Sequence, residues 1–337
     1  MDLNSTAKGG LLLSNVSLTD LEKIPGGVFV GIAGEQDNNT ELTGMIVYNT
    51  NVNTGRGLYV WNGVKWTTFA IGDGDFDPLV PGEVGVLTDP RDNETYLTGN
   101  FGTAGIWMLE NLRYVTGYTH SVYISYTSKY YGYPGANEQP YSTVTAKTNW
   151  NKSWGVLYNW AGATNGRSSN INESDKSYDA GHPKVQGVCP DGWYLPSDWE
   201  WNNLEEVIAA AEKNIYSSED PSPMTSGFRG AMNYRNAPLG RKMKSTSKVT
   251  ETASATNGTS KLAAVGGFDA LLVGIVLEVE DDGTFRRHFG THAYFWSSSS
   301  YNNTYACGRY LTHDNTGVNR YYYGNRSDLY SVRCKKD

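Results

Sequence analysis

The stretch from residue 297 to residue 334 uses a reduced set of amino acids. It contains no Lys, Glu, Gln, Met or Trp, although all of these types occur elsewhere in the chain. Tyr, Asn, Ser, Asp, Gly, Arg, Thr and His dominate instead, with few aliphatic residues. Tyr offers a large contact area with few rotatable bonds, Asn and Ser adapt their hydrogen bonding, and Arg adds a planar charge. This composition favours recognition of a ligand over catalysis.

Long apolar runs and an excess of basic residues are also missing. No stretch reaches about eighteen consecutive apolar residues, so we expect no membrane span. The 28 basic and 35 acidic residues give a net charge of −7, which argues against a nucleic-acid partner. Residues 1–4 lack the charged and apolar regions of a secretory signal, so the protein is either made without one or has lost it.

The length of 337 residues allows two domains. We expect a small β module at 1–72, a linker at 73–84 and a larger domain at 85–337. In the module, the Asn-Gly pair at 62–63 fits a two-residue type I′ turn, which places Tyr59 opposite Trp66 in a hairpin. Alternate aspartates in the linker resemble a calcium loop. However, Pro78 stands where such a loop needs Gly, so we expect no metal there.

The larger domain holds one strongly signalled helix. Ser197 is a good N-cap, and Glu200 completes a capping box. An apolar face follows at the spacing of a helix that ends near residue 211: Trp201, Leu204 and Ile208. Short apolar runs separated by Gly, Asn and Ser make up the rest, with a long loop expected at 214–262. The predicted class is therefore α+β, preceded by the small β-rich module.

The three cysteines, Cys189, Cys307 and Cys334, permit one disulfide and one thiol. Cys189 and Cys334 each lie next to apolar, strand-like residues, which favours a bond between them. Closing so long a loop stabilises by about 4–5 kcal/mol on the chain-entropy estimate. Three reduced thiols in a cytosolic protein are the alternative.

Several spaced motifs identify a family resemblance. They occur in this order: 88–92 (TDPRD), 107–112 (WMLENL), 131–134 (YGYP), 188–197 (VCPDGWYLPS), 296–299 (WSSS) and 331–334 (SVRC). Together they resemble the major paralogous domain first described in Fibrobacter and abundant in Bacteroidetes surface proteins. The resemblance covers roughly residues 84–337.

This resemblance implies a C-type lectin-like fold for the larger domain. It also implies a disulfide between Cys189 and Cys334, where the family usually has paired cysteines. The small module is similar to a short β domain that precedes such regions in Bacteroidetes adhesins and phage tail proteins. The matching residues are 8–12 (KGGLL), 47–50 (VYNT) and 59–63 (YVWNG).

The resemblance also gives the biased stretch a genetic meaning. Diversity-generating retroelements mutate adenines in the gene end that encodes such domains. Asn codons of the form AAY never become Lys, Glu, Gln, Met or Trp in this way, so residues 297–334 are interpreted as a variable segment. The alternative is ordinary family composition, because members often end in Asn-, Gly- and Tyr-rich strands.

The predicted ligand-binding residues of this segment are Tyr301, Asn303, Tyr305, Cys307, Arg309, Tyr310, His313, Asp314, Asn315, Asn319, Arg320, Tyr321, Tyr322, Tyr323, Asn325, Arg326 and Asp328. Residues 321–323 could lie partly in the core, since a strand sends alternate side chains to opposite faces. A second set is expected to be scaffold: Ala306, Leu311, Val318 and Val332.

No chemistry beyond binding is expected. The Glu-Pro-Asn, Gln-Pro-Asp and Trp-Asn-Asp motifs of calcium-dependent lectins are absent, as are nucleophile elbows and phosphate loops. His288 and His292 are spaced as metal ligands on a helix would be, but their aromatic neighbours indicate strand and loop. We therefore expect no enzyme activity, no cofactor and no metal site.

These features predict a surface-displayed adhesin or receptor-binding protein, located outside the cell on a pilus or another surface structure. Its partners would be a protein or glycan ligand and, through the small module, pilus subunits. A phage tail-fibre receptor-binding protein in a virion is the first alternative. A relative of the sulfatase-activating enzymes and a purely structural surface protein are the others.

Overall fold

The computed structural model describes residues 15–25, 36–37, 42, 44–50, 57–61, 65–69, 81–120, 125–135, 150–166, 184–224, 227, 229, 231–276 and 288–337. The contacts within the chain divide it into two compact units, Met1–Asp75 and Phe76–Asp337. Much of the predicted acidic linker, with its aspartates, lies outside the described residues.

The smaller unit is built from short strands. Its main sheet has the order β1 (Asn15–Val16), β4 (Ile46–Asn49), β5 (Gly57–Trp61) and β6 (Trp66–Phe69). A second pair joins β2 (Lys23–Ile24) to β3 (Gln36–Asp37). The buried side chains that hold it together are Val16, Leu18, Ile24, Val47, Tyr59, Trp61 and Trp66.

The predicted hairpin is present, but its predicted register was wrong. Trp61 pairs with Trp66, and Tyr59 pairs with Thr68 instead of Trp66. The observed register brings the two buried tryptophan rings to 5.5 Å in an edge-to-face contact. It also lets the Trp66 indole Nε1 donate to the Lys23 carbonyl at 2.9 Å. The observed register packs two buried indoles together, an arrangement that stabilises beyond the area buried. The predicted Asn-Gly turn at 62–63 lies outside the described residues.

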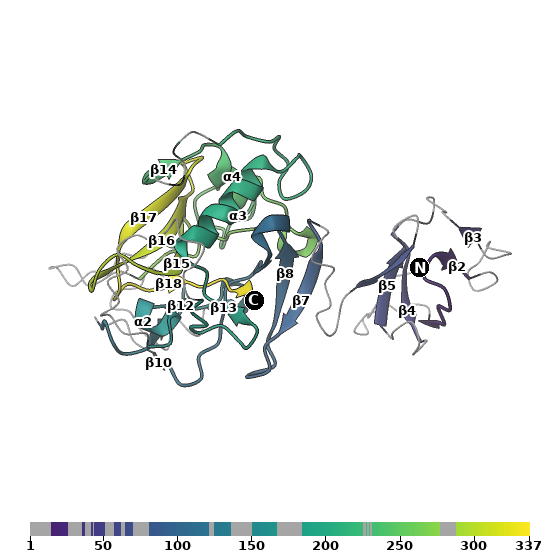
Figure 1. Cartoon of the computed structure of the whole chain (residues 1–337), viewed down its shortest axis with the longest axis horizontal. Coiled ribbons are helices and arrows are strands. Elements are labelled where there is room, and N and C mark those ends of the chain that lie inside the picture. Colours follow the sequence, from purple (N-terminus) through teal and green to yellow (C-terminus); the bar gives the residue numbers. More distant parts are fainter. Residues whose placement is uncertain are drawn as a thin grey trace. The chain divides into compact units, whose positions relative to one another are not determined.

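Two sheets form the larger unit. The eight-stranded sheet has the order β10 (Thr119–His120), β11 (Tyr130–Gly132), β12 (Leu157–Tyr158), β18 (Tyr330–Ser331), β15 (His292–Ser300), β16 (Tyr305–Thr312), β17 (Val318–Asn325) and β14 (Asn233–Arg235). The five-stranded sheet has the order β13 (Trp193–Tyr194), β19 (Lys335–Lys336), β9 (Ile106–Met108), β8 (Thr95–Asn100) and β7 (Val84–Thr88). The long antiparallel strands β15, β16 and β17 lie next to one another (Figure 1).

The predicted helix is confirmed as α3 (Asp198–Ala210), including its capping box. The Ser197 hydroxyl accepts from the Glu200 backbone N–H, and the Glu200 carboxylate accepts from the Ser197 N–H at 2.8 Å. Its apolar face is fully buried, and the Trp201 indole donates to the carbonyl of Trp296 on β15 at 3.3 Å. Figure 1 shows α3 against these strands. None of the described helices is long and apolar enough to cross a membrane.

The predicted α+β, C-type lectin-like class was wrong, because the larger unit consists mostly of β-sheet. Among the described residues, the other helices are single turns: α2 (Trp160–Ala163), α4 (Leu239–Met243) and the 3-10 turns η2 (Gly102–Ala104), η3 (Lys152–Trp154) and η5 (Ala263–Val265). The expected loop at 214–262 contains β14 and α4. The α+β prediction gave too much weight to one well-capped helix, whereas most apolar runs of the described chain form short strands.

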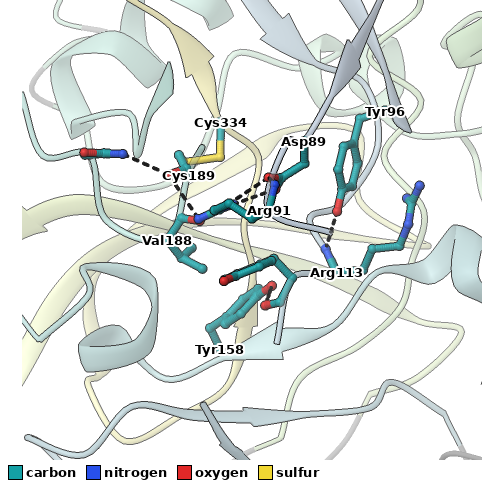
Figure 2. Close-up of a disulfide and its surroundings, with 10 residues drawn as sticks. Asp89, Arg91, Tyr96, Arg113, Tyr158, Val188, Cys189 and Cys334 are labelled. Atoms are coloured by element: carbon teal, nitrogen blue, oxygen red, sulfur yellow. Dashed lines mark hydrogen bonds and ion pairs between the residues drawn. A yellow bond between two sulfur atoms is a disulfide. The ribbon is translucent and has the colours of Figure 1, made fainter. Parts of the chain in front are cut away.

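The predicted disulfide is present and joins Cys189 to Cys334. Beside it, the Arg91 guanidinium binds both carboxylate oxygens of Asp89, at 2.8 and 2.6 Å, and donates to the Val188 carbonyl at 2.9 Å (Figure 2). The ring of Tyr114 covers this guanidinium at 3.8 Å. Arg91 thus ties the turn at 88–92 to the turn that carries Cys189.

The family motifs meet in this part of the core. Arg333 donates from Nε to the Asn111 side-chain oxygen at 3.0 Å, and the Ser298 N–H donates to the Pro196 carbonyl at 2.9 Å. The Met108 N–H binds the Cys334 carbonyl at 2.9 Å. These spaced motifs are therefore scaffold, because they bind one another.

A buried charge cluster fastens α3 to the long strands. Asp198 and Glu205 on the helix face Arg309 on β16, and Arg320 on β17 binds Asp198 through Nε at 3.0 Å. Arg235 on β14 binds Glu205 at 2.9 Å. All five side chains are buried. Burial disfavours ionisation of Asp198, but the charge of Arg309 and the hydrogen bonds from Arg320 hold the pKa of this carboxyl well below its usual range.

Replacing Asp198 by Asn should lower the free energy of unfolding by about 3–5 kcal/mol, because buried arginine charges then lack their main partner. Urea denaturation followed by tryptophan fluorescence would measure this loss. The matched control is Glu206→Gln on the same helix. Glu206 pairs with Arg229 at the surface, and this loss should stay within about 1 kcal/mol. Equal losses for the two variants would show that the buried cluster does not hold the fold together.

Candidate functional site

Strands β16 and β17 carry a connected group of tyrosine rings on the side away from the buried charge cluster. We call it the tyrosine face; its members are Tyr234, Tyr301, Tyr305, Tyr310, Tyr321 and Tyr323. Ring centroids of neighbouring members lie 5.2–6.4 Å apart, with nearly perpendicular planes. Edge-to-face pairs of this kind attract one another and fix the orientation of each ring.

Strand geometry explains why these rings share one side. Arg309 pairs with Arg320 across the two strands, and both point into the core. Their neighbours Tyr310 and Tyr321 must then point outward, since successive side chains of a strand alternate between faces. Tyr323 follows on the same side as Tyr321 and is 47 % exposed.

The turn between β15 and β16 places the remaining rings. The Asn302 side-chain oxygen accepts from the backbone N–H groups of Thr304 and Tyr305, each at 2.8 Å. The Tyr301 backbone N–H also binds the Tyr305 carbonyl at 3.0 Å. These bonds order the turn, so that Tyr301 and Tyr305 both contact the ring of Tyr323.

Polar groups connect to the phenol oxygens at the other end of the face. The Asn319 amide donates to the Tyr310 hydroxyl at 2.8 Å. The Tyr234 hydroxyl donates to Thr312 at 3.1 Å, and the Thr312 hydroxyl donates to Asp314 at 2.9 Å. This last bond lowers the pKa of Asp314, so its exposed carboxylate stays ionised.

Many of the predicted ligand-binding residues lie at the surface. The exposed or half-buried ones are Tyr301, Asn303, Tyr305, Tyr310, His313, Asp314, Asn315, Tyr321, Tyr323 and Asn325. They come from β16, β17 and the turns at the ends of these strands. The structure thus brings together residues that are far apart along the segment.

The other predicted ligand-binding residues are buried, and their role in binding stays a prediction. They are Cys307, Arg309, Asn319, Arg320, Tyr322, Arg326 and Asp328. Arg326, for example, packs over the ring of Trp160 at 4.0 Å. Composition alone does not separate these residues from their exposed neighbours, because the same polar types line both sides of the strands. The predicted scaffold residues Ala306, Leu311, Val318 and Val332 are all buried, as expected.

Tyr234 was missed by the sequence reasoning. It lies on β14, outside the biased segment, and enters the face because β14 pairs with β17 and places it opposite Asn319. It is 40 % exposed, and its ring lies 5.6 Å from that of Tyr310. One feature of the sequence could have indicated Tyr234: residues 233–236 (NYRN) have the same composition as residues 297–334.

The histidines near this face pack against aromatic rings. The rings of His288 and His292 lie 4.3 Å apart, and His292 stacks on Tyr294 at 5.7 Å. Burial, together with His288 and His313, lowers the pKa of His292 to about 4. His292 is therefore neutral near pH 7. Within the described parts of the chain, no group of three or more His, Cys, Asp or Glu side chains is arranged to hold a metal ion.

Comparison with known protein families gave two matches. Residues 1–80 match the model of a phage tail like trimerisation region. Searches of the curated proteins and of the solved structures returned no match. Residues 103–336, more than half of the chain, match the model of the Fibrobacter succinogenes major domain. The motifs that suggested this resemblance are those that meet around the disulfide and α3. The chain belongs to the Fibrobacter succinogenes major domain family.

Proposed function

We propose that this protein is a receptor-binding protein of a phage tail or a related structure and acts by binding, without catalysis. The larger unit would recognise a ligand through the tyrosine face, and the smaller unit would join copies of the chain. The observation that carries the proposal is a group of exposed and half-buried tyrosine rings on a sheet whose opposite side is fixed by buried charges. The match of residues 1–80 to a phage tail like trimerisation region supports the phage context.

The geometry suits recognition for an energetic reason. Tyr has few rotatable bonds, and here ring contacts and hydrogen bonds already restrain several rings. Binding therefore costs little additional side-chain entropy. Tyrosines often supply the residues that dominate the binding energy of an interface. We expect Tyr323, the most exposed member, to be such a residue.

Replacing Tyr323 or Tyr305 by Ala should weaken binding about tenfold or more, the loss typical of a dominant interface residue. Binding of the fluorescently labelled full chain to bacterial strains would be measured by flow cytometry, using strains that the unaltered protein binds. Leu262→Ala is the control, because Leu262 is similarly exposed (53 %) in the larger unit but does not belong to the tyrosine face. If the Tyr323 and Tyr305 variants bind as well as the control, the tyrosine face is not the recognition surface.

The proposed assembly makes a separate prediction. Size-exclusion chromatography with light scattering should give the mass of three chains for the full protein, if residues 1–80 act as their family match suggests. Three copies would present three tyrosine faces and raise the apparent affinity for a clustered receptor. A monomeric mass would contradict the trimer. It would favour the second candidate, a pilus-tip or surface adhesin built on the same family of domain.

We also propose that the outward positions of residues 297–334 are diversified by adenine-directed mutagenesis. The missing amino acid types support this, and so does the structure of the strands. Main-chain pairing and inward residues such as Arg309 and Arg320 hold the segment, leaving Tyr310, Tyr321 and Tyr323 free to vary.

Sequencing around the gene provides the test of diversification. A near-copy of its 3′ end, with AAY codons at the outward positions, should lie beside a reverse transcriptase gene. The inward arginine codons should be unchanged between the two copies. If no such copy exists, the composition is an ordinary property of the family.

A further inference from the structure

The tyrosine face lacks the positive charge that its composition suggests. Residues 297–334 contain four arginines and no lysine, and each arginine is at most 1 % exposed. Their positions are Arg309, Arg320, Arg326 and Arg333. Arg309 and Arg320 bind Asp198, while Arg333 binds the Asn111 side chain and the carbonyl of Phe268. The segment therefore presents no arginine or lysine to a ligand.

Negative charge remains at this surface. The Asp314 side chain is 72 % exposed, and its hydrogen bond from Thr312 favours the ionised form. Burial raises the pKa of Tyr321, and the negative charge of the buried Asp328 raises it further. The amine of Lys244 does not oppose these charges at the surface, because it is buried and donates to the carbonyls of Thr312 and Asn315.

No cation of the described residues covers most rings of the tyrosine face. Elsewhere in this chain, cationic groups lie over tyrosine rings: Arg91 over Tyr114 at 3.8 Å, and Arg113 over Tyr96 at 4.1 Å. Among the described residues, no such cation covers Tyr305, Tyr310, Tyr321 or Tyr323. The negative face of a phenol ring attracts ammonium and guanidinium groups.

We infer that the tyrosine face binds a protein surface rich in Lys and Arg side chains, an inference that rests on the proposed role of this face in recognition. Cationic side chains would stack on the uncovered rings, and one would pair with Asp314. A polyanion such as nucleic acid or an acidic glycan finds no exposed arginine or lysine partner within residues 297–334. Charge complementarity of this kind speeds association and rejects partners of the wrong charge.

Biolayer interferometry with the full chain tests the partner class on three immobilised probes: poly-L-lysine, poly-L-glutamate and dextran. The protein should bind poly-L-lysine alone. Tyr323→Ala and Asp314→Asn should each weaken this binding about fivefold or more, whereas Tyr323→Phe keeps the ring and should retain it. Asp191→Asn and Leu262→Ala are the controls, because both alter exposed residues of the larger unit that do not belong to the tyrosine face, and both should change nothing.

Each remaining outcome overturns a defined part of the inference. If the controls weaken poly-L-lysine binding as much as the face variants do, the attraction comes only from the net charge of −7, and the inference fails. If poly-L-glutamate or dextran binds and Tyr323→Ala abolishes it, the face recognises ligands but the basic partner is wrong. If no probe binds while Tyr323→Ala reduces binding to cells, the face likewise recognises a ligand, and that ligand is not a basic protein surface. If Tyr323→Ala affects neither probes nor cells, the proposed function fails as well.

Discussion

The buried contact of Asp198 and Glu205 with Arg309 and Arg320 is the constraint on which the larger unit depends. Buried guanidinium groups need charged or hydrogen-bonding partners, so β16 and β17 can take only a register that brings them over α3. A slip by one residue would move both arginines to the solvent side and the tyrosines into the core. The cluster therefore fixes the helix, the strands and the orientation of the tyrosine face together.

This arrangement separates stability from recognition within single strands. On β17, Arg320 and Tyr322 face inward and stack on each other at 4.4 Å, while Tyr321 and Tyr323 face outward. The inward side is anchored by charge, by packing and by the disulfide that holds the following chain segment. Outward side chains can then change without loss of the core, which is what a surface that adapts to different ligands requires.

Local sequence signals predicted local structure well. Ser197 and Glu200 marked the start of α3, because capping is an interaction within one turn of chain. The apolar residues Leu311 and Val318 were correctly predicted to be scaffold, because apolar side chains in a polar segment are expected to be buried. The pairing of the two hairpin strands was also predicted, but in the observed register Trp61 lies opposite Trp66, a contact between side chains that the local turn signal does not contain. The overall class was misjudged, because the pairing of many short strands is a long-range property.

By itself, the sequence determined the family, the disulfide partners, the capped helix and the segment in which recognition is expected. Tertiary structure alone decided which residues of that segment reach the surface. Arg309 and Tyr310 are adjacent in the chain, and both have a planar group that can form hydrogen bonds. Arg309 is buried and binds Asp198, whereas Tyr310 lies on the tyrosine face. That difference arises because a strand alternates its side chains between two faces, and only the carboxylates of α3 and the pairing with β14 determine which face is the core.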